Sequence, residues 1–394
     1  MNKKLILNSL YITVLSIFIT ACQPNEKTEK TQEADMHSPK TENIKEAPKR
    51  VNQCYHHLTG TLGDMKITVD LKEEQVEGLE EVQMIGYYRY NKYGGPIALY
   101  GSLNKKGILE LNENGTLGGQ MHQITGKWTS TGFTGEWISG SSDNKRFPVV
   151  LRAADNEALQ FNCHYMEDSI KGFPQLEASP QAHFSAQWFE VDSGNKTLDA
   201  FMKKEIHKGM ASNQENNNAD FLEGEKQAYF EEYLSEMKMA LDDGMVDTSN
   251  IEDHFSMNYD LSLSMDVFYN STDTLTLGYA YYTYAGGAHG IYGTQVASYD
   301  LKNYKKIELK DVLKDGYEEA VSEALANAVR IKFELGEDAP LSDVLFEEAI
   351  EPNDNFGVTD KGIFFVFGPY EIASYAVGEI ELFVAFDRIS DFVK

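Results

Sequence analysis

Hydrophobic and polar positions divide the chain into a part with the short period of β-strands and a later part that mixes strands with helices. Between residues 84 and 151, short alternating runs are separated by turns that contain glycine. Strand signals at a spacing of about 8–12 residues indicate an all-β meander, either a sandwich or a small barrel. The predicted strands are 84–90, 97–103, 107–111, 119–124, 126–129, 135–138 and 147–151.

Beyond residue 165 the pattern changes to helices interleaved with longer strands. Helices are predicted over 197–211, 221–241 and 311–333, and strands over 255–269, 275–284, 291–299, 363–367 and 379–386. This irregular order is typical of an α+β domain with an antiparallel sheet. The pattern therefore predicts two domains, an all-β domain over 54–165 and an α+β domain over 166–394.

The first residues have the features of an export signal. A basic Met-Asn-Lys-Lys start leads into an apolar stretch, which ends at Ile19-Thr20-Ala21-Cys22. This arrangement resembles a bacterial lipoprotein signal peptide over 1–21, in which Cys22 becomes the lipidated first residue. Residues 22–53 are almost without large apolar side chains, which predicts a disordered tether. We therefore expect a lipid-anchored protein of the bacterial cell envelope, with the membrane and its face left open.

Two further cysteines, Cys54 and Cys163, remain for an exported and oxidising compartment. A disulfide between them is the simplest interpretation, and it would mark 54–165 as one unit. By the chain-entropy relation, closing so long a loop contributes about 4–5 kcal/mol. Unpaired thiols and an intermolecular bridge are the alternatives.

Charge is distributed unevenly between the two predicted domains. The formal net charge is −27 for the whole chain: residues 1–21 carry +2, residues 22–53 are neutral, residues 54–165 carry −3 and residues 166–394 carry −26. Such a field repels nucleic-acid phosphates and anionic headgroups, and it speeds encounter with cationic partners. We therefore expect no nucleic-acid partner. Solubility alone is the competing explanation for the charge.

The sequence contains no familiar catalytic signature. It has no Gly-x-Ser-x-Gly nucleophile turn, no His-Glu-x-x-His zinc motif, no calcium loop and no Walker loop. The nine histidines are scattered, and only His56 and His57 are adjacent, which is a poor arrangement for a chelate on a strand. We therefore assign no catalytic residue, no metal site and no cofactor.

One stretch combines aromatic residues with a glycine turn. Tyr282 and Tyr284 alternate on one face of a predicted strand, directly before Ala285-Gly-Gly-Ala-His289-Gly. Tyrosine offers a broad apolar ring with a polar tip, which suits a sugar-stacking or protein-binding platform. The simpler alternative is a hairpin whose glycines supply unusual backbone angles and whose tyrosines pack.

The same stretch carries a family resemblance. The runs 282–290, 297–301 and 307–313, followed by 368–378, resemble the domain of unknown function shared by the lysozyme-sensing anti-sigma factor RsiV and the extracellular part of the peptidoglycan deacetylase PdaC. The resemblance covers roughly residues 180–390, and a proline is common in that family where this chain has Ser374. It implies an α+β extracellular module, which in the anti-sigma factor binds lysozyme.

On that resemblance the leading hypothesis is a non-catalytic envelope lipoprotein that recognises an envelope protein or glycan, with cationic lysozyme as a candidate partner. After the signal peptide the sequence shows no second membrane span and no deacetylase metal motif. The contact surface is predicted at 282–292 and 369–375. Its residues would be Tyr282, Tyr284, His289, Tyr292, Pro369, Tyr370 and Tyr375.

Two other hypotheses remain open. One is a peptidoglycan- or sugar-acting hydrolase, whose carboxylates would assemble only in the folded protein. The other is a structural module in which the β domain binds and the acidic domain is a spacer.

Overall fold

The computed structural model describes residues 54–74, 80–113, 121–211, 221–244 and 255–394. The predicted signal peptide, Cys22 and the predicted tether over 22–53 lie outside these ranges. Within them, no helix is both long enough and apolar enough to cross a membrane.

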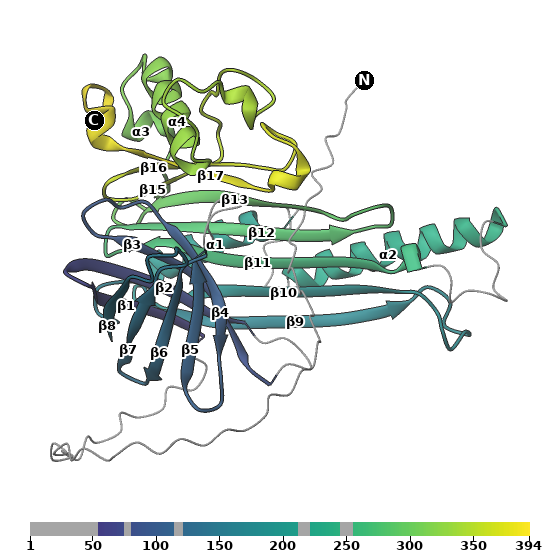
Figure 1. Ribbon diagram of the computed structural model, residues 1–394. Coiled ribbons are helices and arrows are strands. Elements are labelled where there is room, and N and C mark those ends of the chain that lie inside the picture. The colour runs from purple at the N-terminus through teal and green to yellow at the C-terminus, as the bar shows by residue number, and fades with distance from the viewer. Residues whose placement is uncertain (1–53, 75–79, 114–120, 212–220, 245–254) are drawn as a thin grey trace, which may run out of the picture.

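Eight antiparallel strands close into a barrel at the N-terminal end of the described chain, because β1 pairs with both β2 and β8 (Figure 1). The predicted all-β domain is therefore confirmed, in its barrel form. The strands are Tyr55–Leu62 (β1), Met65–Glu74 (β2), Val82–Tyr90 (β3), Ile97–Leu103 (β4), Ile108–Glu113 (β5), Gln123–Thr129 (β6), Gly132–Ile138 (β7) and Arg146–Ala153 (β8).

Strand β2 is buried on both of its faces, which shows how the barrel is attached to the rest of the molecule. Ile67, Val69 and Leu71 join the core inside the barrel. The intervening residues Thr68 and Asp70 point outward, yet they are also buried. Since alternate residues of a strand face opposite sides, the outer wall of the barrel at β2 must lie against another body.

That body is a six-stranded sheet in the order β14-β13-β12-β11-β10-β9. One pair departs from the predicted antiparallel arrangement, because β10 and β11 are parallel. Two helices connect these strands, as a parallel crossover requires. The elements are Phe161–Lys171 (β9), Gln181–Val191 (β10), Lys196–Met210 (α1), Phe221–Asp242 (α2), Tyr259–Asn270 (β11), Thr274–Tyr284 (β12), Ile291–Asp300 (β13) and Lys305–Lys306 (β14).

Helices α1 and α2 cover one face of this sheet and form the largest core with it. Helix α1 begins where the Asn195 side chain accepts hydrogen bonds from the next backbone N–H groups. Its buried residues recur every four positions, at Leu198, Met202, Ile206 and Met210. This spacing places them on one side of the helix, facing the sheet.

The C-terminal unit is a small three-stranded sheet covered by helices. Helix α4 packs on strand β17, and the predicted helix over 311–333 is in fact two helices. Gly316 lies between them with a φ of 85°, which a helix cannot accommodate. The elements are Leu309–Val312 (α3), Glu318–Lys332 (α4), Phe356–Val358 (β15), Gly362–Phe367 (β16) and Ile380–Ala385 (β17), with short 3-10 turns at Phe255–Met257, Leu341–Asp343, Tyr375–Val377, Phe386–Arg388 and Ser390–Phe392.

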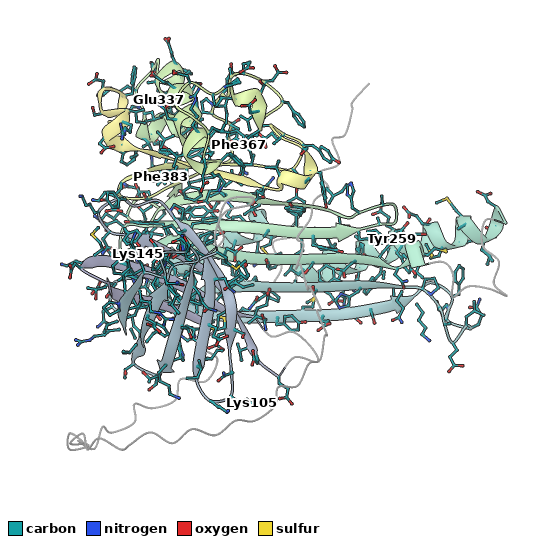
Figure 2. All side chains as sticks on the ribbon, in the orientation of Figure 1. Lys105, Lys145, Tyr259, Glu337, Phe367 and Phe383 are labelled. Atoms are coloured by element: carbon teal, nitrogen blue, oxygen red, sulfur yellow. A yellow bond between two sulfur atoms is a disulfide. The ribbon has the colours of Figure 1, made fainter. Side chains whose placement is uncertain are left out.

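The barrel and the C-terminal unit meet the sheet together at Phe268 of β11. The Phe268 ring stacks on Tyr87 of the barrel, with centroids 4.1 Å apart, and lies 4.8 Å from the Phe364 ring of the C-terminal unit. Phe383 packs beside them at the junction of the three bodies, whereas Phe367 lies inside the C-terminal unit (Figure 2). One aromatic side chain thus ties all three bodies together.

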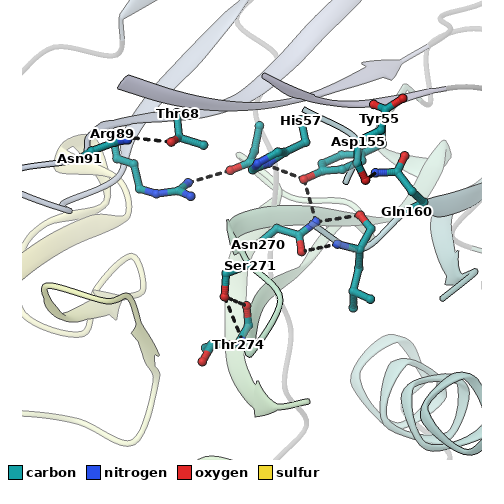
Figure 3. Close-up of polar contacts among 12 residues, drawn as sticks. Tyr55, His57, Thr68, Arg89, Asn91, Asp155, Gln160, Asn270, Ser271 and Thr274 are labelled. Carbon is teal, nitrogen blue, oxygen red and sulfur yellow. Dashed lines mark hydrogen bonds and ion pairs between the residues drawn. The ribbon is translucent and has the colours of Figure 1, made fainter. Parts of the chain in front are cut away.

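A buried ionic network joins the barrel to the sheet (Figure 3). Asp70 Oδ1 accepts hydrogen bonds from the Tyr55 hydroxyl at 2.5 Å and from His57 Nδ1 at 2.6 Å, and Oδ2 accepts one from Arg89 Nη1 at 2.7 Å. The side-chain amide of Asn270, in the sheet, donates to the Tyr55 hydroxyl at 3.0 Å. Burial favours a raised pKa at Asp70, but His57 and Arg89 outweigh it and hold the pKa below its ordinary value.

Side chains of the C-terminal unit hydrogen-bond to the backbone of β13. The outer side of β13 pairs with the two-residue strand β14 only at Tyr299 and Asp300. The Val296 N–H donates to Asn355 Oδ1 at 2.7 Å, and Asn355 Nδ2 donates to the Thr294 carbonyl at 2.8 Å. The Thr294 N–H donates to Glu379 Oε2 at 2.7 Å. These groups take the place of a neighbouring strand, so this edge of the sheet is protected.

The predicted disulfide between Cys54 and Cys163 is present, with Cα atoms 6.1 Å apart. Its place differs from the prediction, because Cys163 lies in β9, within the six-stranded sheet. The predicted domain boundary after residue 165 likewise falls inside β9, which pairs with β10 from Phe161 onward. The barrel is closed by the β1–β8 pairing, so the chain has left it before the second cysteine. The disulfide therefore joins the barrel to the sheet.

Candidate functional site

The two predicted contact segments, far apart in sequence, meet in the folded protein. His289 stacks on Tyr375 with ring centroids 4.1 Å apart, and Tyr370 lies 5.5 Å from Tyr375. Tyr292 meets Tyr375 edge-on at 5.8 Å. We call His289, Tyr292, Tyr370 and Tyr375 the aromatic cluster.

The first segment is the turn between β12 and β13. Gly286 and Gly287 have φ values of 81° and 92°, angles that side-chain-bearing residues rarely adopt. The Tyr284 hydroxyl donates to the Gly287 carbonyl at 3.0 Å, which closes the turn. As a result His289 is held at the exposed tip of the hairpin.

The second segment follows β16 and is shaped by its own hydrogen bonds. Glu371 Oε2 accepts from the Gly368 N–H at 2.8 Å, which closes a turn around Tyr370. Tyr370 has a φ of 66° and its side chain is 59% exposed. Gly378 ends the segment with a φ of 80°, and a Cβ there would lie 2.8 Å from the Tyr292 hydroxyl. Only glycine allows Tyr292 to approach so closely.

A hydrogen bond locks the two segments together. The Tyr375 hydroxyl donates to the Gly290 carbonyl at 3.0 Å, while its ring lies under His289. Burial raises the pKa of both Tyr375 and Tyr292, so these hydroxyls stay protonated at neutral pH. Tyr375 is thus a bridge between the segments, whereas Tyr370 is the most exposed tyrosine of the cluster.

The remaining predicted residues lie beside the cluster rather than in it. Tyr282 is directly opposite Tyr292 in the β12–β13 register, and Tyr284 is opposite Asp260 on the other neighbouring strand. Both tyrosines are partly buried on the sheet. Pro369 is partly buried and precedes Tyr370. Within the predicted set, His289 and Tyr370 are therefore the exposed residues, and the other five are partly buried.

Sequence reasoning missed several neighbours of the cluster. The Phe346 N–H donates to the Ile372 carbonyl at 2.8 Å, so residues 346–354 run beside the second segment, and the Phe346 side chain is 54% exposed. Exposed carboxylates accompany it at Glu347, Glu348 and Glu351. The Glu-Glu pair is visible in the sequence, but the pairing of Phe346 with Ile372 depends on long-range packing.

A partly buried carboxyl, Glu379, lies near Tyr292 of the cluster. Burial raises its pKa to about 7, and the negative groups Asp266 and Glu371 act in the same direction. The Thr294 N–H opposes this shift by donating to the carboxylate. Glu381, two residues further on, has its pKa raised to about 8, chiefly by burial.

A metal centre is not indicated in the described parts of the chain, where no three His, Cys, Asp or Glu side chains gather in an arrangement that could hold a metal ion. His183 contacts two carboxylates, Glu167 at 2.8 Å and Asp260 at 3.7 Å. It does so through different ring nitrogens, so the three groups do not converge on one point.

The C-terminal unit of the chain resembles a protein family of unknown function. Residues 310–387 match a family model described as "Protein of unknown function (DUF3298)". This match covers the C-terminal unit and includes Tyr370 and Tyr375. The sequence predicted a domain of unknown function in this part of the chain, and the DUF3298 match supports that prediction for residues 310–387.

Solved structures of that family resemble this chain. A DUF3298 family member from Bacteroides fragilis is 21% identical, with a TM-score of 0.54 over 61% of this chain and 96% of the other. A DUF3298 family protein from Pseudomonas aeruginosa is 18% identical, with a TM-score of 0.41 over 59% of this chain and 94% of the other. The first likeness concerns the fold alone. No curated protein matches the chain.

Proposed function

We propose that this chain is a non-catalytic lipoprotein of the bacterial cell envelope, and that its aromatic cluster binds a cationic protein at the envelope, with lysozyme as a candidate. The observation that carries the proposal is the meeting of two distant segments in one exposed aromatic surface. Tyrosine is enriched among the residues that dominate binding energy at protein interfaces. The first segment joins two strands of the six-stranded sheet and the second follows a strand of the three-stranded sheet, and this support limits the entropy lost on binding.

The backbone at Tyr370 supports the same proposal. A left-handed conformation at a residue other than glycine costs on the order of 1–3 kcal/mol, and such strain gathers at binding sites. Here the strain places a tyrosine ring in solvent, where it adds little to the core. Contact between the Tyr370 ring and a binding partner would explain why a tyrosine occupies this strained and exposed position.

Charge around the cluster suits a basic partner. Glu347, Glu348, Glu351 and Glu371 are exposed, and Glu371 lies directly after Tyr370 in the second segment. Carboxylates at the rim of an aromatic contact speed association with a cationic protein, and they disfavour acidic competitors. The aromatic surface would provide affinity and the rim would provide selectivity.

The test is calorimetric titration of the chain without its signal peptide, carrying Cys22→Ser, with lysozyme at low and at physiological salt. We expect saturable one-to-one binding at both, weakened about tenfold or more by Tyr370→Ala, which corresponds to about 1.4 kcal/mol. Tyr93→Ala is the matched control, because Tyr93 is 56% exposed but belongs to the barrel.

Two results would contradict the proposal. Binding that disappears at physiological salt would reflect only attraction between an acidic and a basic protein. Equal affinities for the wild type and Tyr370→Ala would remove the aromatic cluster from the interface. Release of soluble sugars from peptidoglycan by the wild-type protein would favour the hydrolase hypothesis instead.

A further inference from the structure

The two edges of the six-stranded sheet are treated very differently. At one edge, β13 is capped by side chains of the C-terminal unit, at Asn355 and Glu379. At the other edge, β9 spans eleven residues and pairs with β10 alone among the described strands. Natural sheets rarely leave so long an edge without protection, because its outward backbone groups can pair with another strand.

Most of β9 is accessible along this edge. Asn162, Glu167, Asp168 and Ser169 are exposed, and only Phe161 is buried. Phe161 packs against Tyr55 of the barrel with ring centroids 4.8 Å apart. The barrel therefore covers one end of β9, and residues 164–171 form the accessible part.

We propose that β9 pairs antiparallel with β9 of a second copy of this chain, in a register centred on Met166, so that two six-stranded sheets become one continuous sheet. A two-fold axis through Met166 makes this contact isologous, the commonest symmetry of soluble dimers. Each chain then supplies the same residues to the interface.

The sequence of β9 is complementary to itself in this register. His164 lies opposite Asp168 of the second copy, and Glu167 lies opposite Tyr165. Within one chain His164 lies 3.3 Å from Glu190, Asp168 lies 2.9 Å from Lys226, and Tyr165 donates to Glu167, so the contacts with the second copy extend these pairs. Met166 meets its own symmetry mate on the axis. Directly opposed residues that attract or hydrogen-bond stabilise a strand pair, whereas like charges destabilise it.

Neighbouring registers that keep the sheet faces aligned are less favourable. A shift of two residues in one direction places the two Glu167 carboxylates opposite each other. A shift in the other direction draws the paired segment toward Phe161, where the barrel already covers the strand. The register centred on Met166 avoids both problems.

The first measurement is the molecular mass of the protein in solution by sedimentation equilibrium. It uses the chain without its signal peptide and with Cys22→Ser. We expect a concentration-dependent mass approaching twice that of one chain. His164→Asp should weaken the dimer, because it opposes Asp168 of the second copy with another carboxylate. Adding Asp168→Asn in the same chain should restore the dimer, since the opposition of two carboxylates is then removed and Lys226, 2.9 Å from Asp168 within the chain, meets no like charge.

A cysteine on the proposed axis tests the register in the full-length chain. Opposed Cα atoms in antiparallel strands lie about 4.5–5.5 Å apart, a separation that a disulfide can span. On oxidation in bacterial membranes, Met166→Cys should yield a dimer on a non-reducing gel, joined between the two introduced cysteines as shown by peptide mass spectrometry. Ile331→Cys, at a 79% exposed position on α4, should yield much less.

A single-chain mass for the wild type at every concentration would overturn the proposal, and so would equal cross-linking of the two cysteine variants. In that event the charges of β9 protect the edge by themselves. Melting temperatures of the variants near that of the wild type would exclude loss of folding as the cause of a lost dimer.

Discussion

The barrel and the C-terminal unit dock on the same sheet through different chemistry. The barrel interface contains buried charged side chains. Asp70 accepts hydrogen bonds from Tyr55, His57 and Arg89, and Lys72 Nζ lies 3.0 Å from Asp266. The C-terminal interface relies on aromatic packing and on amide and carboxyl groups that cap the backbone of β13. One surface is thus held by pairs of opposite charge and the other by burial and neutral hydrogen bonds.

This difference should give the two interfaces opposite responses to pH. The carboxyl of Asp70 has a pKa below its ordinary value of 3.8, so its stabilising effect is complete above that value and is lost as the pH falls below it. Glu379 has a pKa raised from 4.5 to about 7, so its stabilising effect is complete below pH 4.5 and is lost as the pH rises to about 7. A fall in pH below 3.8 should loosen the barrel first, and a rise in pH from 4.5 to about 7 should loosen the C-terminal unit first.

The largest effect is expected from Asp70→Asn. The substitution keeps the shape but leaves the Arg89 charge buried without its partner, which costs about 3–5 kcal/mol of unfolding free energy. Glu136→Gln is the matched control, because Glu136 makes a similar contact with Arg146 at 2.6 Å but in solvent. There we expect less than about 1 kcal/mol. Urea unfolding measures both, and equal losses would show that burial of the pair is unimportant.

A smaller loss is expected from Asn355→Ala. It removes the partners of the Val296 N–H and the Thr294 carbonyl, and a buried backbone group without a partner costs about 1–3 kcal/mol. Asn303→Ala is the control, since that amide bonds only within an exposed turn, to Asp300. Hydrogen exchange should speed up at Val296 in the first variant alone. Unchanged exchange at Val296 would mean that the side-chain cap does not protect this edge.

The smallest effect at neutral pH is expected from Glu379→Gln, whose main consequence is a changed pH profile. In the wild type, thermal stability should fall between pH 4.5 and about 7, as the unfolded chain releases the Glu379 proton before the folded chain does. Asp266, Glu371 and Glu381 face this carboxyl and contribute to the profile. The variant should show a flatter fall over that range. An identical slope in both proteins would assign the pH dependence to Glu381.

Local patterns in the sequence predicted much of the secondary structure, because they depend on neighbouring residues. The helices over 197–211 and 221–241 agree closely with α1 and α2, and the strand over 97–103 agrees with β4. Strand β2 was missed, since both of its faces are buried and polar Thr68 and Asp70 break the apolar pattern expected of a core strand. Tertiary contacts with the sheet explain those polar residues.

The sequence also predicted the candidate site only in part, because some of its contacts join residues far apart in the chain. Glycines and tyrosines marked the turn at His289 and the segment at Tyr370, and the structure places both in one cluster. The contribution of Phe346 could not be read from the sequence, because it depends on a backbone bond to Ile372. Nor could the sequence separate the bridging Tyr375 from the exposed Tyr370.

The disulfide has a mechanical consequence. Cys54 is the residue directly before β1, and it is bonded to Cys163 in β9, an edge strand of the six-stranded sheet. A force applied to the chain ahead of Cys54 therefore passes through the covalent bridge into β9, and does not peel β1 from β2 one hydrogen bond at a time. A pull from an anchored N-terminus would load the barrel and the sheet as a single body, so the barrel should resist unzipping until the bridge is reduced.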